Sequence, residues 1–427
     1  MDLSGRTDAA SGVHNCAGGR TLGGSGAVNG AYFTRATRAD FENWPSSWRY
    51  DDVLPYFKKS ETDRDFEGEF HGTAGPIPVE RRAWDQLHPL SGEFHAAALG
   101  AGFPDDVDKN APDSFGGGPS ALNVSDHRRI STSIGYLMPA LHRPNLRVES
   151  GVNVIRIAFS GTRAIGVDVL DDGNVRRIRA DHVVVCSGAV ATPHILLNSG
   201  VGPAEQLVEQ GVSVVLDRPG VGQNFVDHPE VLLPYHFSKP PRTIRSQTPV
   251  LETALNLAEI EIRPYTASFT ELVPGVPRMD HGVGVVLMAP HSRGSIELAS
   301  RDPLGAAYSV QLRRVGARSS CHSGRDADRR ESSRVDRRDG VDRSPVVEYT
   351  DEWVESRLGT SLHMSGSCVM GAEADPFAVV DGRCRVIGAQ GLSIVDTSIL
   401  PTIPTRGPHA TAVMVAERAS AILLGDE

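Results

Sequence analysis

The segment His182–Gly200 reads HVVVCSGAVATPHILLNSG and decides the fold class of this chain. Its β-branched run, Val183–Val185, predicts a buried strand, and Gly188 permits a tight turn into an apolar helix. Strand, turn and helix in this order form the repeating unit of doubly wound α/β sheets. The residues upstream contain no matching unit. We therefore expect an α/β fold with an incomplete doubly wound domain.

The segments on either side of this unit predict further strands and helices. Short β-branched runs between residues 145 and 180, NLRVES, VNVIRIAF, AIGVDVL and NVRRIRA, predict a sheet. Helices are expected at 50–61, 88–101 and 133–142, and RGPHATAVMVAERASAILL predicts a terminal helix. Residues 230–312 alternate apolar strands with Pro-rich turns. This pattern predicts a second, mostly antiparallel α+β domain.

Composition narrows the function classes. The chain has 427 residues, a net charge of −10 and a pI near 5.8, which disfavours nucleic acid or an anionic membrane as partner. We expect neither a membrane span nor export, because no apolar run reaches the length of a span and the first residues lack a charged-then-apolar pattern. The five cysteines, odd in number and without a C-x-x-C pair, favour the cytoplasm. We expect small-molecule chemistry there.

Residues 313–343 depart from this globular composition. They hold ten Arg, five Asp and one Glu among thirty-one residues, and no Leu, Ile, Phe, Tyr, Trp or Met. Such a segment cannot bury an apolar face. The alternatives are a disordered loop, a basic binding segment, or a stretch translated out of frame.

The glycine-rich stretch GGRTLGGSGAVNG, residues 18–30, raises the possibility of a phosphate loop. Its nearest approach to G-x-G-x-x-G has Asn29 in place of the last glycine. No apolar strand precedes it, so it lacks the strand and helix that hold a pyrophosphate. We expect it to contact another part of a ligand.

Two histidines are candidates for proton transfer. His363 and His409 lie in turns rich in Gly, Ser and Thr, and His409 opens the terminal helix, whose N-terminus favours a nearby negative charge. A structural role is the alternative for each. The sequence has no H-x-x-x-H metal motif and no G-x-S-x-G hydrolase motif. No metal is expected.

Six segments in order resemble the glucose–methanol–choline (GMC) oxidoreductases, which use FAD. They are GGRTLGGSGAVNG, SGAVATPHILLNSGVGP, PGVGQNFVDHP, SRGSIELASRDP, GTSLHMSGSCVMG and GLSIVDTSILPTIPTRGPHATAVMVAER. GGSGAVNGAYF and ETDRDFEGEFHGTAGPIPV are similar to the branch associated with mycofactocin, a peptide-derived redox cofactor.

The resemblance implies the site residues. His363 matches the general base that takes the hydroxyl proton of an alcohol, and His409 matches its partner. Val28 stands where some members attach FAD covalently through histidine, so FAD is expected to bind non-covalently. The expected cofactor-binding residues are Gly24, Ser25, Asn29, Gly30, Val154, Asp396, Thr397, Ala410 and Thr411.

The resemblance also implies the domains and partners. Residues 18–60, 146–229 and 375–427 would form the FAD-binding domain, and 61–145, 230–312 and 344–374 the substrate-binding domain with connectors. The expected partners are a small-molecule alcohol and an electron acceptor linked to mycofactocin or to the respiratory chain.

Two departures from the family pattern give the alternative interpretations. The family's first βαβ unit, with G-x-G-x-x-G, is absent, and residues 313–343 match nothing in it. An N-terminally truncated chain with an out-of-frame segment is expected on this basis. The alternatives to an active enzyme are a non-catalytic remnant without FAD and a binding protein that uses the Arg-rich segment.

Overall fold

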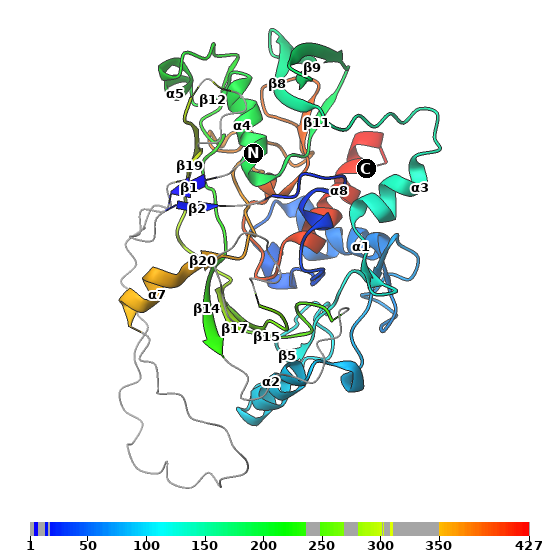
Figure 1. The fold of residues 1–427 in the computed structure, drawn as a ribbon. Coiled ribbons are helices and arrows are strands. Elements are labelled where there is room, and N and C mark those ends of the chain that lie inside the picture. The colour runs from blue at the N-terminus through cyan, green and yellow to red at the C-terminus, as the bar shows by residue number, and fades with distance from the viewer. Residues whose placement is uncertain are drawn as a thin grey trace.

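The computed structural model describes residues 4–6, 13–15, 18–235, 248–268, 281–300, 302, 308–310 and 350–426 (Figure 1). The expectation for residues 313–343 falls outside these ranges. The strands are β1 (Ser4–Arg6), β2 (Val13–Asn15), β3 (Glu61–Asp63), β4 (Ile77–Val79), β5 (Gly116–Pro119), β6 (Val124–Ser125), β7 (Arg128–Arg129), β8 (Asn153–Ser160), β9 (Arg163–Asp171), β10 (Asn174–Arg179), β11 (Val183–Val185), β12 (Val201–Gly202), β13 (Leu216–Asp217), β14 (Pro229–Tyr235), β15 (Thr253–Asn256), β16 (Ile260–Pro264), β17 (His281–Leu287), β18 (Ile296–Leu298), β19 (Tyr308–Val310), β20 (Leu358–Thr360) and β21 (Leu392–Ile394).

The α-helices are α1 (Tyr50–Ser60), α2 (Pro89–Gly100), α3 (Met138–Ala140), α4 (Gly188–Asn198), α5 (Ala204–Glu209), α7 (Asp351–Arg357) and α8 (His409–Leu424). Short 3-10 helices are η1 (Gly24–Ala27), η2 (Arg38–Phe41), η3 (Ser46–Trp48), η4 (Trp84–Gln86) and η6 (Thr397–Ile399). Among these described helices, none combines the length and apolar character that a membrane crossing requires.

The predicted strand–turn–helix unit is present as β11 and α4. Gly188 takes a φ of +83°, which lets the chain turn directly from the strand into the helix. The strand partner is β21, which pairs with β11 in parallel, Val183 opposite Leu392 and Val185 opposite Ile394. This parallel element confirms the α/β class, although its partner comes from the far end of the chain.

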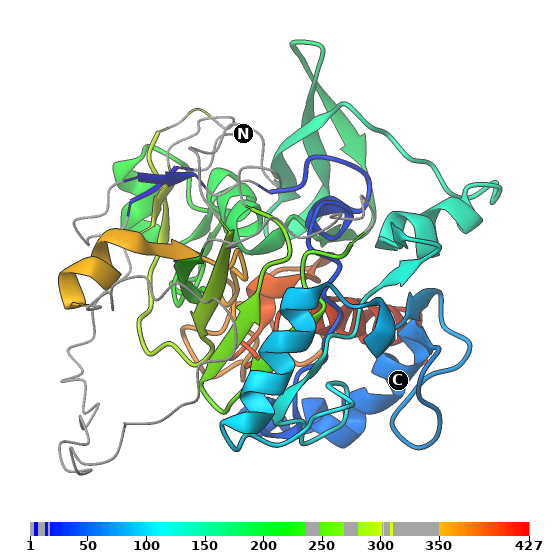
Figure 2. The same cartoon turned by 60° about the horizontal axis from the view of Figure 1, so that its bottom comes forward.

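A six-stranded antiparallel sheet confirms the second architecture expected from residues 230–312. Its order is β20-β14-β17-β16-β15-β5. Helix α2 packs on the β5, β15 and β16 end of the sheet, as Figure 2 shows from below. The sheet therefore also recruits residues 116–119 and 358–360 from outside the predicted stretch.

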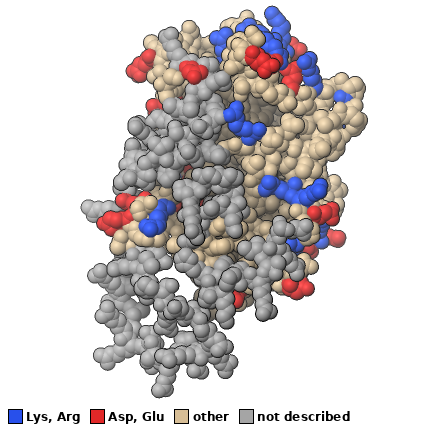
Figure 3. Space-filling view, in the orientation of Figure 1, with Lys and Arg blue, Asp and Glu red and all other residues tan. Residues whose placement is uncertain are grey.

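A three-stranded meander, β8 to β10, forms a sheet of its own at the top of Figure 1, where β8 packs on α4 and β9 contacts β11. Its charged side chains form ion pairs: Arg156 and Arg177 hold Asp168, and Arg176 holds Asp171 and also Glu149, which precedes β8. Figure 3 accordingly shows blue and red side by side over this end of the molecule. The patch is mixed in sign rather than basic.

Two local predictions were wrong. NLRVES, residues 145–150, forms no strand, because most of its side chains are exposed and its backbone pairs with no described strand. Residues 133–142 form a π-helical turn, Ser133–Leu137, followed by the short α3, instead of one regular helix. The helices expected at 50–61, 88–101 and the C-terminus are confirmed as α1, α2 and α8.

The main core lies where α1 and α8 pack against each other and against the parallel element (Figure 1). Helix α1 begins with a capping box in which Asp52 accepts from the Arg49 backbone. Fully buried Trp48 donates to the Gly382 carbonyl at 2.9 Å, and Trp44 donates to Thr402. Residues 41–57 are thereby fixed to the C-terminal segment.

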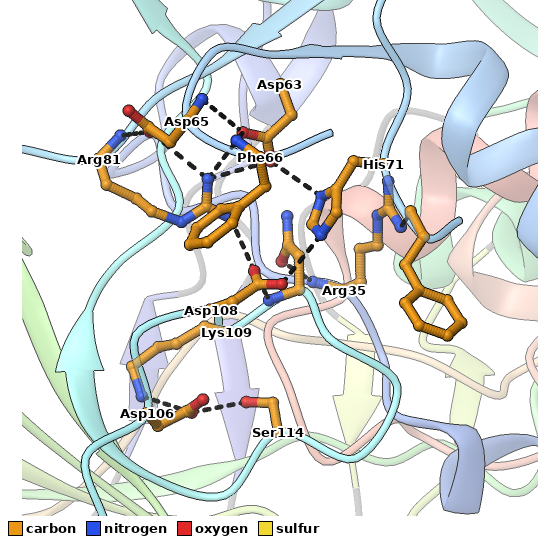
Figure 4. A network of polar contacts seen from close by, with 12 residues as sticks. Arg35, Asp63, Asp65, Phe66, His71, Arg81, Asp106, Asp108, Lys109 and Ser114 are labelled. Carbon is orange, nitrogen blue, oxygen red and sulfur yellow. Dashed lines mark hydrogen bonds and ion pairs between the residues drawn. The ribbon is translucent and has the colours of Figure 1, made fainter. Parts of the chain in front are cut away.

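A buried charge network connects this core to residues 61–81 and 105–114 (Figure 4). Asp63 and Asp108 lie on opposite sides of His71, 3.2 Å from Nδ1 and 2.9 Å from Nε2. Arg81 reaches both carboxylates, and Arg35 pairs with Glu61. Burial lowers the pKa of His71, but the hydrogen bonds to Asp108 and Asp63 outweigh it and raise the pKa to about 10.

This charge balance argues against a metal in the network. Ligand atoms of Glu61, Asp63 and His71 lie within 4.8 Å of one another. The two carboxylates, however, already hold arginines, and a protonated His71 has no lone pair to give. We assign the network to structure.

The raised pKa of His71 makes stability depend on pH. The unfolded chain loses this proton near pH 6.5 and the folded chain only near pH 10, so this stabilisation is complete below pH 6.5 and declines up to pH 10. The decline is at most about 1.4 kcal/mol per pH unit. Urea unfolding between pH 6.5 and 9.5 should show a flatter decline in His71→Gln. Exposed His142→Gln should keep the parent slope. Equal slopes in the parent and His71→Gln would contradict this assignment.

Candidate active site

The backbone of His363 is fixed by the turn that follows β20. Leu362 is held in the left-handed region, with a φ of +59°, and its N–H donates to Thr360 Oγ1 at 2.8 Å. This conformation is costly for a γ-branched residue and is found where the surroundings impose it. The N–H of His363 then donates to Asp227 Oδ1 at 2.8 Å.

A second histidine contacts the ring of His363. Nδ1 of His228 lies 2.9 Å from Nδ1 of His363, and the ring planes meet at 90°. The N–H of His228 donates to the same Asp227 oxygen, at 2.7 Å. One carboxylate oxygen thus holds the backbones of both histidines.

Both rings are neutral at pH 7. Burial, with the nearby His228 and Arg263, holds the pKa of His363 well below its usual range. Burial and Arg263 lower the pKa of His228 to about 3. Arg263 remains charged because its guanidinium pairs with Glu230 at 2.8 Å and Glu261 at 3.1 Å. A neutral imidazole can accept a proton, so His363 has the protonation state that a general base requires.

His409 is the first residue of α8, as the sequence predicts. Its ring meets Phe33 edge-on, with centroids 5.3 Å apart. Burial, and next the charge of Arg129, lower its pKa to about 4, so this ring is also neutral at pH 7. The preceding Pro408 provides no side-chain cap for the helix. The first N–H groups of α8 therefore remain available beside His409.

The structure brings His363 and His409 to one place. A Cβ built on Gly407 would lie 3.4 Å from Nε2 of His363 and 3.4 Å from Tyr32. Nε2 of His363 therefore faces the segment that leads into His409, while Nδ1 faces His228.

The glycine-rich loop covers the same place. Residues Gly24–Ala27 form η1, and a Cβ on Gly26 would lie 2.8 Å from Cε1 of His409. Arg129 of β7 anchors the loop by donating to the carbonyl oxygens of Ala27 and Asn29. A Cβ built on Gly24 or Gly30 would meet no atom within 4 Å. Gly24 and Gly30, two of the predicted loop residues, therefore border open space.

Two further loop residues use their side chains to shape the backbone. Ser25 Oγ accepts from the N–H of Gly19 at 3.1 Å. Asn29 Oδ1 accepts from the N–H of Ala31 at 3.0 Å, and Ala31 has a φ of +62°. Ser25 and Asn29 therefore fix the loop conformation in addition to any contact with a ligand.

The other predicted cofactor residues lie at different distances from the histidines. Thr397 is close, because its hydroxyl donates to the carbonyl of Met364, next to His363. Asp396 accepts from the N–H of Gly188 at 2.9 Å and from the Thr192 hydroxyl at 2.6 Å, so it joins η6 to the start of α4. Val154 belongs to the separate meander, 40% exposed, and makes no described contact with the others.

The residues around the histidines fit the flavin end of FAD. The first turn of α8 is uncapped, and its buried Thr411 hydroxyl has no partner among the described residues. Ala410 and Thr411 are fully buried in this turn. Free N–H groups and the helix dipole favour the electron-rich edge of a reduced flavin, and no atom lies within 4 Å of a Cβ built on Gly24 or Gly30.

Comparison with known proteins shows the family. The family description "GMC oxidoreductase" matches residues 6–230 with its N-terminal part and residues 290–416 with its C-terminal part. The chain belongs to the GMC oxidoreductases, which makes it an FAD-dependent oxidoreductase and confirms the resemblance seen in the sequence.

Individual relatives agree with this assignment. The chain is 85% identical over 412 residues to an uncharacterized GMC-type oxidoreductase of Rhodococcus erythropolis, covering 96% of this chain and 83% of the relative. It is 33% identical to an oxygen-dependent choline dehydrogenase of Brucella anthropi, covering 95% and 82%. The crystal structure of pyridoxine 4-oxidase from Mesorbium loti superposes with a TM-score of 0.82 at 25% identity, covering 98% and 87%.

Sequence reasoning missed Asp227 and His228. Both lie in PGVGQNFVDHP, which served only to support the family resemblance. An Asp-His pair placed directly before a strand was the available local signal. Nothing in the sequence of either segment indicates that His228 contacts His363, which lies 135 residues away.

The packing of the loop on His409 can be tested with a methyl group. Gly26→Ala places a Cβ 2.8 Å from His409 Cε1, so the ring must move. We expect flavin reduction by an alcohol to slow by about 10²-fold, because a shift near 1 Å is that costly at a reacting centre. Gly18→Ala, whose Cβ would lie 3.9 Å from Ser25 Oγ, should remain within about twofold of the parent. Stopped-flow absorbance measures both, and equal rates in the two variants would show that the loop does not position His409.

Proposed function

We propose that this chain dehydrogenates an alcohol, with His363 as the general base. The observation that supports this role best is a neutral His363 whose Nε2 faces the Gly407–His409 segment. Dehydrogenation removes a proton from the hydroxyl oxygen and a hydride from the carbon. When bound, FAD accepts the hydride at flavin N5.

His409 is proposed as the partner that holds the substrate oxygen. A neutral imidazole can donate one hydrogen bond, here to the alkoxide that forms as His363 takes the hydroxyl proton. The positive charge of Arg129 nearby and the N-terminus of α8 favour that negative charge. Phe33, packed against the His409 ring, keeps the ring in place and excludes water from one side of it.

FAD is proposed to bind non-covalently through the nine residues predicted from the sequence. Val28, which is 58% exposed, has a side chain that cannot form a bond to the flavin. Gly24, Ser25, Asn29 and Gly30 would border the flavin, with Ala410 and Thr411 at the start of α8. Asp396 and Thr397 would lie along the chain that leads from the flavin, and the backbone of Val154 at the adenine.

The substrate, acceptor and domain limits are proposals of the same kind. The substrate is a small-molecule alcohol, and the acceptor that reoxidises FAD is linked to mycofactocin or the respiratory chain. The cytoplasm is the proposed compartment, supported by free Cys186, Cys368 and Cys384. Residues 18–60, 146–229 and 375–427 are proposed as the FAD-binding domain, and 61–145, 230–312 and 344–374 as the substrate-binding domain with connectors.

The roles of the two histidines predict different losses. His363→Ala should slow flavin reduction by about 10²–10⁴-fold with FAD still bound, because only proton removal is lost. His409→Asn should be milder, since asparagine still donates a hydrogen bond at a helix start. The measurement is anaerobic stopped-flow reduction by a panel of primary alcohols that includes choline and pyridoxine.

The same experiment gives the pH dependence. Because the pKa of His363 lies well below its usual range, the parent rate should be constant from pH 6.5 to pH 9. A normal rate in His363→Ala, or a greater loss in His409→Asn than in His363→Ala, would show that the assignment of roles to the two histidines is wrong.

A second candidate is a remnant that keeps the fold without retaining FAD. The observation in its favour is the open edge of β11, which pairs with β21 on one side and with no described residue on the other. Val184, in the middle of this apolar strand, is 41% exposed. Strands of parallel sheets are ordinarily buried on both faces, so the region beside β11 offers FAD less enclosure than the flavin end does.

One experiment separates the two candidates and tests non-covalent binding. We expect the purified protein, after incubation with FAD and gel filtration, to carry flavin that acid denaturation releases completely into the supernatant. Flavin that stays with the precipitate would contradict the role given to Val28. A protein that retains no flavin after this treatment would favour the remnant.

A further inference from the structure

The bond between His228 and His363 joins two nitrogens of the same kind, so one must carry the proton. At 2.9 Å between Nδ1 and Nδ1, a single N–H donates and the other nitrogen accepts. Both rings are neutral, and a neutral imidazole carries its proton on one nitrogen only. The direction of this bond therefore fixes the tautomer of each ring.

The proposed role of His363 as base sets the direction of this bond. A base that takes a proton at Nε2 must leave that nitrogen unprotonated, so a neutral His363 carries its proton on Nδ1. Nδ1 of His228, 2.9 Å away, is then the acceptor, and His228 carries its own proton on Nε2, which has no hydrogen-bond partner among the described residues.

The other polar groups nearby cannot replace His228 in this role. Asp227 accepts from the backbone N–H groups of His228 and His363 and from the Thr360 hydroxyl, so its carboxylate serves the backbone. Arg263 is a donor only and is held by Glu230 and Glu261. Fully buried His228 is the acceptor that the described residues offer to Nδ1 of His363.

We propose that His228 is a positioning residue: it accepts the Nδ1–H of His363 and so keeps Nε2 of His363 unprotonated and directed at the Gly407–His409 segment. This inference rests on the proposed role of His363 as base. When His363 takes the hydroxyl proton at Nε2, its Nδ1–H stays bonded to His228, which holds the ring in place without taking a proton itself.

The test compares a variant that removes the acceptor with one that restores it. His228→Leu keeps apolar bulk but offers no lone pair, and we expect flavin reduction by a saturating alcohol to slow by about 10²-fold, because His363 then spends most of its time in unproductive tautomers and orientations. The alcohol concentration for half-saturation should change little. His228→Asn, whose Oδ1 can take the place of Nδ1, should recover most of the rate.

Matched substitutions at another buried histidine provide the control. His95 is 8% exposed and burial lowers its pKa, as at His228. His95→Leu and His95→Asn should both keep the parent rate. Equal rates in His228→Leu and His228→Asn would overturn the proposal, because loss of packing would then explain the effect.

A spectroscopic measurement on the unmodified holoenzyme needs no variant and does not depend on catalysis. Two-bond ¹H–¹⁵N spectra of protein labelled with ¹⁵N-histidine report which ring nitrogen carries the proton, and His363→Gln assigns the signal. We expect protonated Nδ1 and unprotonated Nε2 in His363. The reverse tautomer would overturn the inference even if His228→Leu failed to fold.

The outcomes also separate this inference from the proposed function. If His363→Ala leaves flavin reduction unchanged, the proposed base is wrong, whatever the tautomer. If His363→Ala abolishes reduction and His228→Leu retains the parent rate, the base stands and the positioning role of His228 is wrong.

Discussion

The carboxylate of Asp227 is the constraint on which the site depends. Its Oδ1 accepts from the N–H groups of His228 and His363, and its Oδ2 accepts from the Thr360 hydroxyl. Burial raises the pKa of this carboxyl to about 6, although each of these donors acts in the opposite direction. At pH 7 it is therefore ionised in an enclosed place, and its charge is balanced by donors that fix two distant segments.

The antiparallel sheet explains how Asp227 can hold both segments. β14 begins at Pro229, directly after His228, and β20 ends at Thr360, with these two residues opposite each other. The end of one strand pair thus delivers both histidines side by side. The other wall comes from α8 and the glycine-rich loop, which bring His409 and Gly26 together. The site forms where the antiparallel sheet meets the core that contains the parallel element.

Much of this arrangement was predictable, because some signals are local. Val183–Val185 and Gly188 predicted β11 and α4, and the small residues around His363 and His409 marked both as candidates. The strand partner β21 was not predictable, because three residues 200 positions away carry no pairing signal. NLRVES has the composition of a strand but no neighbour to pair with. The left-handed backbone conformation of Leu362 is imposed by its hydrogen bond to Thr360. The residue type does not predict it, because Leu362 is not a glycine.

The contacts between residues 18–235 and residues 350–426 have a consequence for how the fold tolerates a break in the polypeptide. Residues 18–235 and 350–426 are joined by β11 with β21, by β14 with β20, by α1 packed on α8, and by Arg406 bound to the Ser114 carbonyl at 2.7 Å. These contacts bury apolar surface and complete both sheets without requiring a peptide connection. Two separately synthesised fragments, divided between residues 310 and 350, would each expose the surface that the other covers. The fold is thus suited to fragment complementation, with His363 and His409 on one fragment and Asp227 and His228 on the other.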